Sequence, residues 1–238
     1  MSRQNSTNSN NPIVVLISAS QEWQAVLGYY HPATLEPTPY GDCFHLKLSS
    51  GDDLVFLHGG WGKIKAAGST QYAISRWNPK LIINLGTCGG FTGQVELNEV
   101  ILVEKTIVYD LIEQMLDPDA AIRAYTTELD LSFLHEPYPQ LVRKTLLVSG
   151  DRDLVAGEIP ELRRKYGAVA GDWESGAIAF ISKANYVPCL ILRGVSDLVG
   201  NEGGEVYDNI TLFAERAKGV MLNLLGYLEG WVKQSGKA

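Results

Sequence analysis

Short runs of apolar residues, each closed by glycine or polar residues, recur along the chain and predict buried β-strands. Such continuous runs are typical of strands covered on both faces. Between several of them, apolar residues recur at the spacing that gives a helix one buried face. This alternation predicts an α/β fold. The expected strands are 12–18, 43–48, 54–57, 80–85, 99–104, 144–148, 168–171 and 189–192, and the expected helices are 22–29, 64–77, 120–134, 207–231 and one from Glu174 onward.

The connections between these elements carry weaker signals. Turn residues at 50–53 separate two of the runs, which predicts a β-hairpin. The stretch 105–139 is acidic and interrupted by prolines, and we expect a loop with one helix that could cover a site. Residues 1–11 are polar, with no apolar run, and we expect a disordered tail that is neither a signal nor a transit sequence. Residues 12–238 are then expected to form one domain.

Three acidic residues come directly after predicted strands. Glu22 follows the first run, Glu174 follows 168–171, and Asp197 follows 189–192. Ligands of open α/β sheets bind beyond the carboxyl ends of the strands, so these acids are candidates for one site. The alternative is structural, with Asp197 as a helix N-cap and the two glutamates as first-turn residues that complement helix dipoles.

Glycine-rich segments follow two other strands. Gly86-Thr87-Cys88-Gly89-Gly90 would let backbone amides approach a ligand, and Thr87 adds a hydroxyl group. Residues 59–63, Gly-Gly-Trp-Gly-Lys, lack the residue order of a nucleotide phosphate loop. We therefore expect a conformational role for this second segment.

Composition narrows the classes of function. The chain has 238 residues, 45% of them hydrophobic, and a formal net charge of −7. This charge argues against nucleic acid as a partner, because phosphate neutralisation needs a basic face. No stretch of eighteen apolar residues occurs, so we expect no membrane span.

Cysteine and histidine residues suggest neither disulfides nor a metal site. The three cysteines lack C-x-x-C spacing, and their odd number is typical of reduced core residues in a cytoplasmic protein. The four histidines lack metal-ligand spacing. We expect no metal and no cofactor. The residues concerned are Cys43, Cys88, Cys189, His31, His45, His58 and His135.

One long string carries a family resemblance. Residues 172–200, DWESGAIAFISKANYVPCLILRGVSDLVG, resemble the C-terminal signature of the purine nucleoside phosphorylase and nucleosidase superfamily. The resemblance is closest to the methylthioadenosine/S-adenosylhomocysteine nucleosidases, whose pattern runs E-M-E-A-x-A-x-A and then P-x-x-x-x-R-x-x-S-D. Segments 86–90 and 149–154 are similar to the family's G-[ST]-[AC]-G-G and S-G-D-x-F-[IVL].

This resemblance implies the fold and a set of residue roles. The fold would be a three-layer αβα arrangement around a mixed, twisted sheet, and the partners would be a nucleoside and a second copy in a homodimer. Asp197 would protonate the leaving base, Glu174 would bind the ribose hydroxyls and Glu22 would activate water. The implied substrate-binding residues are Thr87, Gly89, Asp153, Leu154, Trp173, Arg193 and Ser196.

Two departures from the family pattern concern the substrate. Asp153 stands where the family has an aromatic residue against the base, and Trp173 stands where it usually has methionine against the ribose and 5′ group. Asn84 stands where bacterial phosphorylases have a phosphate-binding arginine, which favours water over phosphate as nucleophile. The alternatives are a phosphorylase of the same fold and a nucleoside-binding module without activity.

Overall fold

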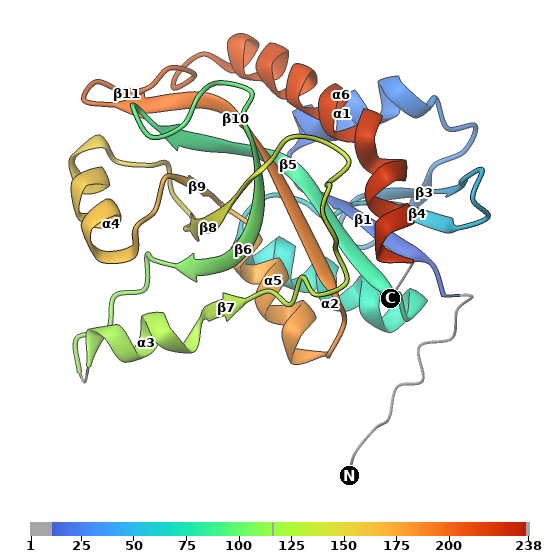
Figure 1. Ribbon diagram of the computed structural model, residues 1–238, viewed down its shortest axis with the longest axis horizontal. Helices are drawn as coiled ribbons and strands as arrows, with labels where there is room; N and C mark the ends of the chain where they lie inside the picture. The colour runs from blue at the N-terminus through green and yellow to red at the C-terminus, as the bar shows by residue number, and fades with distance from the viewer. Residues whose placement is uncertain (1–10, 116, 237–238) are drawn as a thin grey trace.

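One mixed sheet of eleven strands runs through residues 11–115 and 117–236, the part of the chain described by this computed structural model (Figure 1). The tail expected at 1–11 lies almost wholly outside the described residues. The strands are β1 (Ile13–Ile17), β2 (Glu36–Pro37), β3 (Asp42–Lys47), β4 (Asp53–His58), β5 (Leu81–Phe91), β6 (Val100–Val108), β7 (Thr126–Glu128), β8 (Arg143–Ser149), β9 (Ala170–Asp172), β10 (Cys189–Gly200) and β11 (Gly203–Gly204).

Helices cover both faces of this sheet, which gives the expected three-layer αβα fold (Figure 1). Helices α1 and α6 pack together on one face, and α2 and α5 pack together on the other. The helices are α1 (Ser20–Tyr30), α2 (Lys63–Trp77), α3 (Pro118–Ala124), the 3₁₀ turn η1 (Ala156–Glu158), α4 (Ile159–Tyr166), α5 (Ser175–Ala184) and α6 (Ile210–Ser235).

Strand pairing brings distant parts of the chain to one edge. Strand β1 lies parallel between β4 and β5, and β10 lies parallel to β5 on its other side. Strands β5, β10, β6, β8 and β9 then close into a ring, because β9 pairs back onto β5. The carboxyl ends of β1, β5 and β10 therefore meet at one side of the sheet, where ligands of α/β proteins bind.

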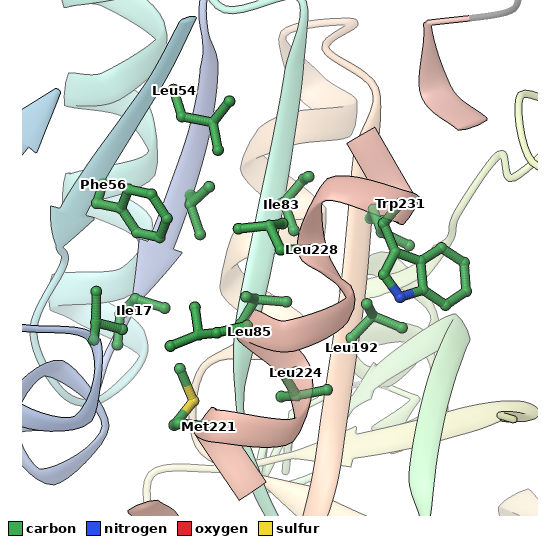
Figure 2. Packing of buried hydrophobic residues seen from close by; sticks show 14 of the residues in the cluster. Ile17, Leu54, Phe56, Ile83, Leu85, Leu192, Met221, Leu224, Leu228 and Trp231 are labelled. Atoms are coloured by element: carbon green, nitrogen blue, oxygen red, sulfur yellow. The ribbon is translucent and has the colours of Figure 1, made fainter. Parts of the chain in front are cut away.

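The core lies between the sheet and the two helical layers. Figure 2 shows Met221, Leu224 and Leu228 of α6 packed onto β5 and β10, with Leu85 among the contacting side chains. These four side chains are at most 1% exposed. Burying each of them contributes about 1.5–3 kcal/mol relative to an exposed position. On α6, Ala217 and Val220 are buried as well, whereas Phe213 is only half-buried.

Strands β5 and β10 are longer than the apolar runs predicted. The glycine-rich segment 86–90 lies inside β5, and residues 193–197 lie inside β10, where the two segments pair with each other. The pairing register shifts between Val195 and Asp197, which marks an irregularity at Ser196. Hydrogen bonding to the neighbouring strand continues both strands beyond the point where their residues stop being apolar.

The acidic segment also differs from the prediction. Strand β6 continues to Val108, α3 spans only Pro118–Ala124, and Thr126–Glu128 form β7 against β6. The carboxylate of Asp117 caps α3 by accepting from the Asp119 amide. Two consecutive threonines then favour the extended conformation of a strand. No helix of the described residues is long and apolar enough to cross a membrane.

Candidate active site

A cavity of about 690 Å³ opens at the carboxyl ends of β1, β5 and β10. This volume lies within the range of small-molecule sites. Its walls come from the start of α1, the loop before α2, strand β5, the loop after β8, the segment between β9 and α5, strand β10 and the start of α6. The three acids predicted from sequence, Glu22, Glu174 and Asp197, all line it.

Glu22 is positioned by hydrogen-bond donors on both of its oxygens. Thr87 donates to Oε1 through its backbone amide at 2.6 Å and through its hydroxyl at 2.8 Å. The amide of Ala19 donates to Oε2 at 3.1 Å. Only 3% of the residue is exposed, and Glu22 lines the cavity. Glu22 therefore joins the first turn of α1 to β5 and is fixed in direction.

Glu174 is held between β9 and α5 by a residue 112 positions earlier. The amide of Gly62 donates to its Oε1 at 3.1 Å. Burial raises the pKa of this carboxyl to about 8, and the negative charge of Asp172 adds to the effect, whereas Arg193 opposes it. The loop at 59–63, for which we expected a conformational role, thus contributes directly to the site.

Arg193 lies behind the cavity wall and is not one of the lining residues. Its guanidinium is fully buried and contacts Asp172 at 2.8 Å, Asn84 at 2.7 Å and Ser175 at 3.0 Å. The Nη1 atom has no partner among the described residues and lies near Glu22 beside Gly86. Arg193 therefore pairs with Asp172 and lies close to Glu22 behind the cavity wall.

Asp197 lies on β10 at the register shift. Ser196 donates to its Oδ1 at 2.8 Å, and only 4% of the residue is exposed. Burial raises the pKa of this carboxyl, an effect that Ser196 and Arg216 partly offset and that Glu205 and Asp153 reinforce. A carboxyl with a raised pKa can remain protonated and act as a general acid.

The loop after β8 forms the wall near Asp197. Leu154 and Asp197 both approach Gly89, where a side chain would meet Leu154. The carbonyl of Leu154 accepts a hydrogen bond from the Tyr207 hydroxyl at 3.0 Å. Asp153 also lines the cavity. The backbone carbonyl of Leu154 therefore already has one hydrogen-bond partner.

Two tryptophans form another wall. The rings of Trp61 and Trp173 stack with centroids 4.6 Å apart and planes 28° apart. Trp61 is 62% exposed. The predicted Trp173 thus lines the cavity together with a second indole ring that was not predicted.

The structure brings together every predicted site residue except Arg193. Thr87, Gly89, Asp153, Leu154, Trp173 and Ser196 all line the cavity with the three acids. Trp61, Arg152, Tyr207 and Phe213 were missed as lining residues. An aromatic residue within a glycine loop was the one signal that could have indicated Trp61. No described residue of 105–139 lines the cavity, so the described part of this segment does not form the cover that we expected.

Within the described ranges, no three or more His, Cys, Asp or Glu residues are grouped so that they could hold a metal ion. The acidic residues that line the cavity are Glu22, Asp153, Asp172, Glu174, Asp197 and Asp208. Its lining residues among those described include a single cation, Arg152, which pairs with Glu158 at 2.9 Å.

Comparison with known proteins finds similar sequences. The model of the phosphorylase superfamily matches residues 12–226. A 5′-methylthioadenosine/S-adenosylhomocysteine nucleosidase of Marinomonas sp. is 25% identical over 228 residues, which cover 88% of this chain and 96% of the relative.

Solved structures share the fold at low identity. The 5′-methylthioadenosine/S-adenosylhomocysteine nucleosidase of Helicobacter pylori aligns with a TM-score of 0.78 at 16% identity, covering 94% of this chain and 98% of that one. The futalosine hydrolase of the same species gives the same TM-score, identity and coverage. The nucleosidase of Neisseria meningitidis gives 0.74 at 22% identity, covering 94% and 99%.

Proposed function

The chain belongs to the phosphorylase superfamily, and from this premise we propose that it is a nucleosidase that hydrolyses the N-glycosidic bond of a 5′-modified purine nucleoside. The products would be a free base and a ribose derivative, as with methylthioadenosine or adenosylhomocysteine. The observation that carries the proposal is the convergence of Glu22, Glu174 and Asp197 on one cavity from three distant parts of the chain.

The proposed reaction assigns one task to each acid. Asp197 donates its proton to the purine as the bond between C1′ and the base nitrogen breaks, and Glu22 accepts a proton from the water that attacks C1′. Glu174 accepts hydrogen bonds from the ribose hydroxyls while positive charge develops on the sugar. The raised pKa of Asp197 supports its role as the acid.

Water is the proposed nucleophile because the described lining residues offer no unpaired cation to a phosphate. Asn84 is fully buried, donates to the carbonyl of Leu16 at 3.0 Å and accepts from Arg193 at 2.7 Å. It is therefore unavailable to a ligand. Arg152, the single lining cation among the described residues, is already paired. A phosphate dianion would lack the charge-assisted contacts that it needs.

The decisive experiment is chromatographic detection of free base from a nucleoside panel, with and without phosphate. The panel contains methylthioadenosine, adenosylhomocysteine, deoxyadenosine, inosine and futalosine. We expect release without phosphate and a loss of about 100-fold or more in kcat for Asp197→Asn, since general acid catalysis contributes about 10²–10⁴-fold. The exposed Asp130→Asn is the matched control and should keep wild-type turnover.

The alternatives make different predictions in the same assay. Strict phosphate dependence would identify a phosphorylase. Tight nucleoside binding by calorimetry, without base release after long incubation, would identify a binding module. Nearly full turnover of Asp197→Asn would remove Asp197 from the mechanism.

We further propose that residues 12–238 form one domain and that the chain forms a homodimer. Ile64 and Ile112 are 86% and 82% exposed, and the ion pair of Lys63 with Asp110 holds their segments together. We propose that these two exposed apolar side chains contribute to the subunit contact, because apolar surface patches often mark protein interfaces. Sedimentation analysis at micromolar concentration should give twice the monomer mass.

A further inference from the structure

The stacked indoles of Trp61 and Trp173 have no part in the reaction described above. Trp61 is flanked by Gly60 and Gly62, whose φ values of 80° and 85° suit glycine, and stacking on Trp173 fixes the ring beside the cavity. One face of Trp61 contacts Trp173, yet 62% of the residue is exposed. An exposed, fixed indole at a ligand cavity offers a free π-face.

The position of this pair relates it to the sugar. Trp173 directly precedes Glu174, and Gly62, the residue after Trp61, donates its amide to Glu174. Asp197, which is proposed to act on the base, instead lies near Leu154 across Gly89. A nucleoside bound between these two acids directs its remaining substituent, at C5′, to the Glu174 side of the cavity. The indoles therefore form a wall on the ribose side of the cavity.

The charges of the cavity define what this wall can bind. Six carboxyl groups line the cavity against one arginine, and that arginine is paired with Glu158. Asp172 is neutralised by Arg193, and burial raises the pKa of Glu174 and of Asp197. The remaining carboxylates still give an excess of negative charge, which repels anions and attracts cations. They are Glu22, Asp153 and Asp208.

We propose that Trp61 and Trp173 bind a cationic 5′ substituent, such as an ammonium or sulfonium group, and so make the cavity selective for positively charged nucleosides. This inference rests on the proposed function. A cation over an indole face is attracted by the quadrupole of the ring, and tryptophan is the strongest of the aromatic residues in this respect. The negative charge of the cavity also attracts a cation. A 5′-phosphate would meet repulsion from both.

A matched pair of substrates tests the charge alone. Adenosine derivatives with 5′-aminoethylthio and 5′-propylthio groups have chains of equal length, and only the first is a cation at neutral pH. We expect kcat/KM to be about fivefold higher for the aminoethylthio compound in low salt, the factor that one partly exposed cation–π contact contributes. A 5′-phosphate compound should be the poorest of the set.

Substitutions then assign the effect to the indole. Trp61→Leu should bring the ratio of the two kcat/KM values close to one, and Trp61→Phe should keep part of the preference. Tyr186→Leu is the matched control, because Tyr186 is 92% exposed and does not line the cavity. It should keep the wild-type ratio.

The outcomes separate this inference from the proposed function. Base release at equal rates from both substrates, or faster release from the neutral one, would overturn the inference and leave the nucleosidase standing. No base release from either substrate or from the nucleoside panel would overturn the nucleosidase itself. A Trp61→Leu enzyme with a changed sedimentation coefficient and a wild-type ratio would assign Trp61 to a subunit contact and overturn the inference.

Discussion

Glu174 should make the folded protein less stable as the pH rises, and Glu174→Gln should remove this penalty. Burial raises the pKa of the carboxyl from its ordinary 4.5 to about 8. A folded-state pKa above the unfolded value means that the folded protein holds its proton more tightly. The penalty is therefore absent well below pH 4.5, grows between pH 4.5 and 8, and is constant above pH 8.

The size of the penalty follows from the same shift. One pKa unit corresponds to about 1.4 kcal/mol, so the full difference amounts to about 5 kcal/mol. Glutamine keeps the oxygen that accepts from Gly62 and has no charge to bury. The free energy of unfolding of Glu174→Gln should exceed that of the wild type by about 5 kcal/mol at pH 9 and by about 1 kcal/mol at pH 5. Activity should fall in the same variant.

Urea unfolding at pH 5 and at pH 9 measures both differences. The exposed Glu215→Gln on α6 is the control and should change the unfolding free energy equally at the two pH values. An equal effect of Glu174→Gln at both pH values, or a loss of stability at pH 9, would refute the reasoning, because it would mean that Glu174 is ionised without cost in the folded protein.

Substitutions at four further positions probe the neighbouring contacts. Arg193→Met should lower the unfolding free energy by about 3–5 kcal/mol in urea titrations, because it leaves the buried Asp172 without its 2.8 Å partner. Thr87→Val removes the hydroxyl that contacts Glu22 and should reduce kcat about tenfold, whereas Thr87→Ser should retain it. Arg216 lowers the pKa of Asp197, and Asp153 raises it. Since the acid works when protonated, the basic limb of the pH–rate profile should move to higher pH in Arg216→Gln and to lower pH in Asp153→Asn.

Apolar runs located the strands well because a buried strand must be apolar wherever it has no hydrogen-bonding side chain. The run 80–85 predicted the start of β5, and 189–192 predicted the start of β10. Their ends could not be predicted. Residues 193–197 are polar in part yet buried, because Arg193 pairs with Asp172 and Ser196 donates to Asp197. A hydropathy pattern shows that a side chain is polar but not whether a buried partner will hydrogen-bond to it.

Residues far apart in sequence explain what was missed at the site. Trp61 reaches the cavity because Trp173, 112 positions later, stacks on it, and Tyr207 reaches it through the Leu154 carbonyl. Neither contact leaves a local pattern. Glu22, Glu174 and Asp197 were identifiable because each follows a predicted strand, and the sheet places strand ends together. The stretch 105–139 is acidic, but its acidic residues do not follow a predicted strand end. Its described residues do not line the cavity.

Glu22 is proposed to accept a proton and Asp197 to donate one. The surroundings of each residue suit its proposed task. The two carboxylate oxygens of Glu22 accept three hydrogen bonds. The group proposed to activate water is therefore surrounded by hydrogen-bond donors. Asp197 receives one hydrogen bond, from Ser196, and burial favours its protonated form. A binding module would have no need to separate its carboxyl groups in this way. The asymmetry therefore supports the proposed transfer of protons at both ends of a glycosidic bond.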